Sequence, residues 1–184
     1  AGSLMAAAAQ QQIPATRLDM LSLEPTWQTA EIAQGRFVVP GSTVEEKAVA
    51  FISSRPDLFK LNSASQELLL TRQSTDQFGN PHLCFQQRFQ GLRVWGKETI
   101  VHFREDQSIY LVGGQLIPTP SLATSPAVDM ATAEATARAI LADSLVGEST
   151  YANSELLIYP DRNGTSHLAW LVTITGGERS AIRW

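Results

Sequence analysis

Hydrophobic positions follow a helical period in one early stretch of the chain and a two-residue period after it. The helical stripe consists of Val44, Ala48, Phe51 and Ile52. These positions recur on one face of a 3.6-residue helix. Thr43 and Glu46 have the spacing of a capping box, which starts a helix. Because the residue before a proline disfavours helical backbone, we expect this helix to end before Pro56.

From residue 66 to residue 118 the pattern alternates, as in half-buried strands. Turn-forming residues occupy 76–81, and a second polar turn occupies 105–108. Residues 109–117 form the last strand of this stretch. A helix followed by a meander of four to five strands predicts an α+β layer in which the helix covers one face of the sheet.

The stretch 83–96 predicts a hairpin within that meander. One strand face carries Leu83, Phe85, Gln87 and Phe89, and the other carries Cys84, Gln86 and Arg88. Gly91 lies where the chain must reverse, because glycine enters positive φ without steric cost. Val94 and Trp95 begin the return strand, and Gly96 is placed for a bulge or a close backbone approach.

A second unit follows a linker at 119–127. Prolines at 118, 120 and 126 favour extended backbone in and beside this linker. Asp129 is a good helix N-cap, and the inner face of the predicted helix comprises Ala133, Ala137, Ile140 and Leu141. Two strands then flank the turn 161–164, and residues 181–184 begin a further strand. We therefore predict two modules, each a helix packed on an antiparallel sheet, at 41–118 and 128–184.

The N-terminal 40 residues give less information. Residues 1–9 have the small-residue pattern of the end of a secretory signal peptide, but they also fit a cloning scar. Residues 10–40 show no clear period, and we expect an extended arm or a short strand against the first module.

Composition excludes several classes of partner. The net charge is −4 and no run of lysine and arginine occurs, so the sequence does not indicate nucleic-acid binding. No apolar run approaches the roughly 20 residues that a membrane span needs. Cys84 is the single cysteine, so no disulfide can form within the chain, and a buried hydrophobic role is expected for it.

The motifs of zinc hydrolysis and of nucleotide binding are absent from the sequence. The three histidines, His82, His102 and His167, form no His-Glu-x-x-His, which zinc peptidases use to hold their metal. A structural or exposed role is expected for His102 on its strand. We predict that the chain is not an enzyme and that it has no catalytic residue, no metal ligand and no cofactor.

The hairpin resembles the fungalysin/thermolysin propeptide module of secreted zinc peptidases, whose pattern is Gln-x-Phe/Tyr-x-Gly-Val-x-Val-x-Gly. The matching positions are Gln87, Phe89, Gly91, Val94 and Gly96. Leu92 departs from the usual valine, which changes shape rather than chemistry. The second unit resembles a PepSY domain, with Leu168 and Trp170 in a Leu-x-Trp-x-Val feature. We expect these seven residues to be mainly architectural.

The two modules in this order resemble the pro-region of thermolysin-like zinc metallopeptidases. The resemblance implies a secreted, extracellular or periplasmic propeptide of a zymogen. Such a propeptide acts as an intramolecular chaperone and protease inhibitor, its partner is the catalytic domain, and proteolysis removes it. The family's pro-region continues across the active-site cleft beyond the point matching Trp184, so the second module is expected to be truncated. Ile182 and Trp184 are candidate protease contacts. The alternative is a free-standing secreted inhibitor or cell-envelope binding module without a cognate catalytic domain.

Overall fold

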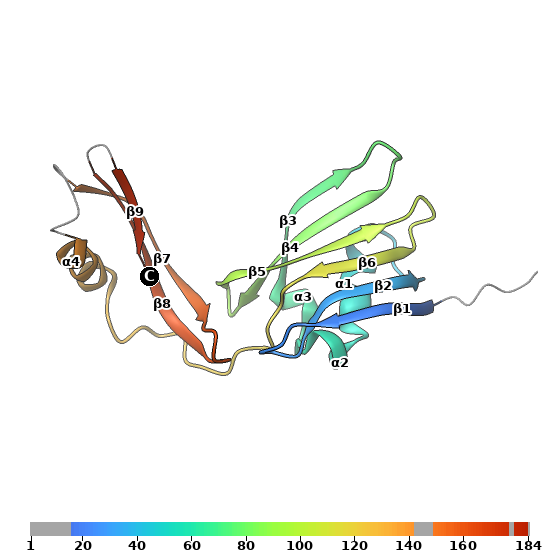
Figure 1. Cartoon of the computed structure of the whole chain (residues 1–184), viewed down its shortest axis with the longest axis horizontal. Helices are drawn as coiled ribbons and strands as arrows, with labels where there is room; N and C mark the ends of the chain where they lie inside the picture. Colours follow the sequence, from blue (N-terminus) through green and yellow to red (C-terminus); the bar gives the residue numbers. More distant parts are fainter. Residues whose placement is uncertain (1–15, 142–148, 177–178, 184) are drawn as a thin grey trace, which may run out of the picture.

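The computed structural model of the chain describes residues 16–141, 149–176 and 179–183 (Figure 1). Six strands form a first antiparallel sheet in the order β1-β2-β6-β5-β4-β3. Their bounds are β1 (Thr16–Leu23), β2 (Ala30–Phe37), β3 (Leu68–Thr75), β4 (Pro81–Phe89), β5 (Leu92–Phe103) and β6 (Ile109–Gly114). The alternating pattern of 66–118 therefore forms the predicted meander. The region expected as an arm or a short strand supplies β1 and β2, and β2 pairs with β6.

Three helices cover one face of this sheet, α1 (Val44–Ser53), α2 (Pro56–Phe59) and α3 (Ala64–Glu67). The predicted capping box is confirmed, since the Thr43 hydroxyl accepts the Glu46 N–H at 3.1 Å and the Glu46 carboxylate accepts the Thr43 N–H at 3.4 Å. The helix α1 ends three residues before Pro56, which then opens α2. Four-residue helices such as α2 and α3 are too short for a periodic signal, and the sequence did not predict them.

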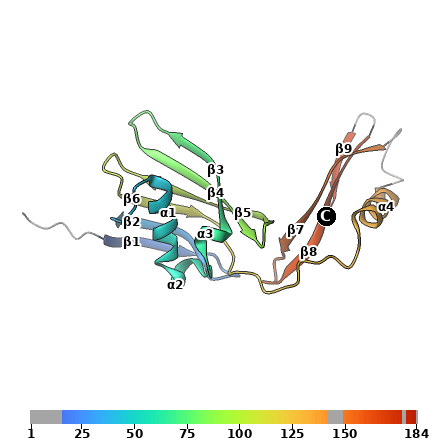
Figure 2. The same ribbon diagram turned by 180° about the vertical axis from the view of Figure 1, so that it is seen from behind.

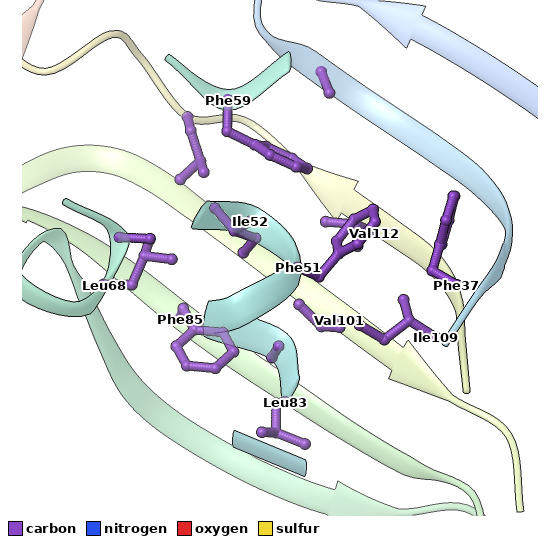
Figure 3. Packing of buried hydrophobic residues seen from close by; sticks show 14 of the residues in the cluster. Phe37, Phe51, Ile52, Phe59, Leu68, Leu83, Phe85, Val101, Ile109 and Val112 are labelled. Carbon is purple, nitrogen blue, oxygen red and sulfur yellow. The ribbon is translucent and has the colours of Figure 1, made fainter. Parts of the chain in front are cut away.

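The main core lies between these helices and the sheet, and Figure 3 shows its packing. The rings of Phe37 on β2 and Phe51 on α1 pack with centroids 4.5 Å apart. Phe85 on β4 and Val101 on β5 contribute from neighbouring strands and have no exposed surface. Because β2 supplies Phe37, residues before the predicted module boundary at 41 are part of its core.

The second sheet contains β7 (Ser149–Pro160), β8 (Ser166–Gly176) and β9 (Arg179–Arg183), paired antiparallel in that order. The helix α4 (Met130–Leu141) packs on it through Leu141, with Ala133 and Ala137 alongside. Ile140 was expected on this inner face, but it is 70% exposed. Positions 133, 137 and 141 form a row four residues apart, and Ile140 lies about 100° around the helix from Leu141.

The α+β class is confirmed, because helices pack on largely antiparallel sheets in both halves (Figures 1 and 2). The two sheets meet where β5 pairs with β7 in parallel, at Val94 and Ile158. None of the helices within the described ranges has the length and hydropathy to cross a membrane. The domain boundaries assigned from the sequence stay a prediction.

Candidate functional site

The turn of the β4–β5 hairpin consists of Gln90 and Gly91, both with positive φ (50° and 85°). Two consecutive positive φ values are typical of the tight two-residue turn that fits the twist of a hairpin. The turn directly follows Phe89, which is buried, and directly precedes Leu92. The glycine of the motif is therefore placed by backbone geometry, as the sequence predicted.

A bulge in β5 follows the turn, and Gln86 fills it. Between the pairs Gln86–Glu98 and Arg88–Arg93, one residue of β4 lies opposite four residues of β5. The buried Gln86 amide donates to the carbonyls of Val94 (2.8 Å) and Lys97 (2.9 Å), which the bulge removes from the ladder. Gly96, with φ 64°, lies in this bulge, as its sequence context predicted.

The bulge explains how one strand serves both sheets. It turns Val94 away from β4, and Val94 pairs instead with Ile158 of β7. Gln86 was not among the residues selected from the sequence, although it directly precedes Gln87. The alternating pattern places Gln86 on a strand face that is expected to face solvent. In the structure only 5% of Gln86 is exposed.

Gln87 lies on the opposite face and is fully buried. Its side-chain amide donates to the carbonyl of Ile117 at 2.8 Å and accepts the Ile117 N–H at 2.9 Å. This two-way pairing continues the hydrogen-bond ladder beyond the end of β6. It attaches the segment that leads into the linker to β4 of the first sheet.

The contact between the modules has an apolar centre and a polar flank. Its buried residues are Phe89, Val94, Ile117 and Ile158, with Trp27, Leu92, Leu122 and Leu168 packed around them. At the flank, the Arg93 guanidinium donates two hydrogen bonds to the Glu155 carboxylate, at 3.0 and 2.5 Å. These bonds lower the pKa of Glu155 below its usual range, in spite of partial burial. Of the five hairpin motif residues, Phe89 and Val94 thus lie in the contact that positions the second sheet, and Gln87 bonds to Ile117 within it.

Trp170 belongs to the second module alone. Its indole N–H donates to the carbonyl of Val128 at 2.8 Å, and its ring packs beside Leu141 and Val172. It therefore joins the residues before α4, α4 itself and β8. Leu168, two residues earlier on β8, packs at the contact between the modules.

The face of the first sheet opposite the helices has exposed and half-buried apolar side chains, and we call it the open face. By the strand register it includes Met20, Ile32, Ile100 and Leu111. Met20 is 46% exposed, and the other three are half-buried. Within the described ranges no helix lies over this face (Figures 1 and 2). A sheet face of this kind is suited to contact a partner surface.

The two candidate protease contacts lie at the end of the chain. Ile182 is in β9, where its backbone pairs with Thr173. Trp184 lies outside the described residues. Across residues 16–141, 149–176 and 179–183, no group of three His, Cys, Asp or Glu side chains could hold a metal ion. Both contact assignments stay predictions.

The hairpin lies within a segment that matches a known protein family. Residues 66–116, which span β3 to β6, match the family described as the Fungalysin/Thermolysin Propeptide Motif. The chain carries a thermolysin-type propeptide motif. The resemblance of the first module is thereby confirmed, and the PepSY interpretation of the second module stays a prediction.

Similarity to part of several proteases extends beyond the motif. The chain is 28% identical over 156 residues to a thermolysin of Alicyclobacillus acidocaldarius subsp. acidocaldarius, covering 80% of this chain and 28% of that protein. It is 29% identical over 158 residues to the thermostable neutral protease NprT of Geobacillus stearothermophilus, with the same shares. It is 27% identical over 164 residues to bacillolysin of Bacillus subtilis (strain 168), covering 83% and 30%. The chain thus spans less than a third of the length of these relatives.

Proposed function

We propose that this chain is the non-catalytic pro-region of a secreted thermolysin-like zinc metalloendopeptidase. In this proposal it assists folding of the catalytic domain and inhibits it until proteolysis removes the pro-region. The observation that carries the proposal is the propeptide motif at 66–116, within a similarity to thermolysin that covers four fifths of the chain. The catalytic domain of the same precursor is the proposed partner.

The architecture supports a role as a template. The two sheets are joined by the β5–β7 pairing, a shared apolar cluster and the Arg93–Glu155 ion pair. A surface that keeps its shape before contact loses less conformational entropy on binding, which favours affinity. Assistance of this kind lowers a folding barrier, and the folded protease then persists through slow unfolding.

The open face is the surface that we assign to the partner. Its apolar side chains lie on neighbouring strands of a regular sheet, so a partner can bury them together. Inhibition follows when the bound chain covers the substrate cleft, with affinity concentrated in a few buried anchors. The segment containing Ile182 is the proposed extension toward that cleft.

A refolding assay tests the proposal. The denatured catalytic domain of the same precursor is refolded with and without this chain, and peptide hydrolysis is measured. We expect the chain to increase recovered activity and an excess of it to slow the mature enzyme. Unchanged recovery together with unchanged activity of the mature enzyme would reject the proposal. The coding sequence beyond Trp184 provides a second check, because the proposal requires a downstream His-Glu-x-x-His.

A further inference from the structure

Two histidines face each other on the neighbouring strands β4 and β5 of the first sheet. His82 on β4 pairs in register with His102 on β5, and their Nδ1 atoms lie 2.9 Å apart. The rings meet edge to face, with centroids 4.8 Å apart. A contact of this length between two ring nitrogens is a hydrogen bond, so one hydrogen lies between them.

The carboxylate of Asp76 determines which ring supplies that hydrogen. Its Oδ2 lies 3.4 Å from Nε2 of His82. The Asn80 side chain donates to the same carboxylate, and the N–H groups of Phe78 and Asn80 donate to its other oxygen. These bonds, the Asn80 side chain first, lower the pKa of Asp76 to about 2. A charged carboxylate favours a proton on Nε2 of His82, so Nδ1 of neutral His82 accepts from His102.

The hydrogen bond between the two rings depends on how many protons the pair carries. The neutral pair is satisfied, with the His102 Nδ1–H donating to His82. A first added proton enters at Nε2 of His102; the hydrogen between the rings then lies on Nδ1 of His82, whose positive charge is beside the Asp76 carboxylate, and the bond between the rings remains. A second added proton must occupy Nδ1 of His102, and two N–H groups then point at each other between two positive rings. The contact cannot survive that state, because both the hydrogen bond is lost and like charges face each other.

The surroundings do not cancel this repulsion. On β3 the residue paired with His82 is the uncharged Ser74. On the β6 side the ring of Tyr110 lies 5.8 Å from that of His102, and the Arg104 guanidinium lies 5.0 Å from the Tyr110 ring. Asp76 is the carboxylate in contact with the pair, and it contacts His82 alone. Burial, followed by the charge of His82, lowers the pKa of His102.

The lowered pKa of His102 determines how the stability of the folded chain depends on pH. The folded chain resists protonation of His102, whereas the unfolded chain accepts the proton near the ordinary value of 6.5. The contribution of the pair to stability is therefore fully present above about pH 6.5. It is lost as the pH falls below that value toward the folded pKa of His102.

We propose that the His82–His102 pair is an acid-sensitive latch, which holds β4 to β5 through one shared hydrogen and opens when both rings are protonated. The latch lies on the open face, beside the β3–β4 turn, in which Asp76 accepts hydrogen bonds from Phe78 and Asn80. The Phe78 side chain in this turn is 74% exposed. Acidification therefore loosens this part of the open face first. The latch is a property of the chain by itself and does not depend on the proposed function.

Nuclear magnetic resonance of the imidazoles in the complete chain tests the latch directly, since the sequence has three histidines. We expect His102 to bind its proton at lower pH in the unmodified chain than in His82→Gln, which removes the facing ring and its charge. The matched control, His167→Gln, removes the histidine of the second sheet and should leave the His102 titration unchanged. A His102 titration that is the same in His82→Gln as in the unmodified chain would overturn the proposal.

Urea unfolding at pH 7.5 and pH 5.0 measures the consequence for stability. On acidification, the unfolding equilibrium constant of the unmodified chain should rise about fivefold more than that of His102→Gln. This factor corresponds to two unit charges about 4 Å apart in water. If His102→Gln does not fold, His82→Gln serves in its place, because it removes the same bond from the other strand. Equal pH dependence of the variant and the unmodified chain would also overturn the latch.

Discussion

The side chain of Gln87 and the backbone of Ile117 form two hydrogen bonds in opposite directions, at 2.8 and 2.9 Å. Thirty residues separate the two positions, and both are fully buried. Water therefore cannot replace either bond if the amide is lost. The pairing fixes the chain at the point where it leaves the first sheet for the second, so Gln87 helps to determine how the linker begins.

We expect Gln87→Leu to destabilise the chain by about 2–4 kcal/mol. The substitution leaves the N–H and the carbonyl of Ile117 buried without partners, and each unpaired group costs about 1–3 kcal/mol. Urea unfolding at neutral pH measures the difference. The control is Gln77→Leu in the exposed β3–β4 turn, which should change stability by less than about 0.5 kcal/mol. Equal stability of the two variants would contradict the role assigned to Gln87.

Gly91→Ala should cost about 1–2 kcal/mol through the backbone alone. An added Cβ meets no atom within 4 Å, so the cost comes from the φ of 85°, which alanine disfavours. Gly113→Ala is the matched control, because there the nearest atom to an added Cβ is 4.0 Å away and φ is not positive. Thermal unfolding of both variants makes the comparison. Gly91→Asn should recover part of the loss, since asparagine tolerates this region. A Gly91→Ala chain as stable as Gly113→Ala would exclude the strained-turn explanation.

The sequence predicted those features of the first module that depend on the local backbone geometry of one or two residues. The capping box at Thr43 and Glu46 and the turn at Gly91 are of this kind, because local geometry alone determines them. The role of Gln86 could not be predicted in this way. Its amide compensates for a bulge eleven residues later in the chain, and alternation predicts only that its side chain faces away from Gln87.

Long-range pairing explains the other differences. β1 has no strong period because it is an edge strand with side chains exposed along most of its length, so the register of β1 with β2 and of β2 with β6 defines this pair of strands. The parallel contact of Val94 with Ile158 joins residues far apart in the sequence, and neither residue type indicates it. Local patterns therefore identified the motif residues, while the contact that most of them build required the structure.

The ion pair between Arg93 and Glu155 should contribute about 1 kcal/mol at neutral pH, as a half-buried pair with two charge-assisted bonds. A double-mutant cycle with alanine at both positions measures this coupling. Because the pKa of Glu155 is lowered in the folded chain, the coupling is present above about pH 4.5 and is lost as the pH falls below that value. The exposed pair Arg55–Asp57 is the control, with an expected coupling below about 0.5 kcal/mol. A coupling that persists unchanged at pH 3 would show that the charge of Glu155 is not its source.

Ile100→Lys should weaken inhibition of the mature peptidase at least about tenfold and leave the chain folded. Ile100 lies on the open face beside Gly113, which Ile32 flanks on the other side, so a lysine there places a charge within the proposed apolar contact. Burying an unpaired ammonium against a partner is costly, whereas in the free chain the ammonium stays in water. The inhibition constant against peptide hydrolysis measures the effect, and circular dichroism verifies the fold. Ile140→Lys makes the same change on the exposed side of α4 and should leave inhibition unaltered. If the two variants inhibit equally, the partner binds another surface, and the open face has to be assigned a different role.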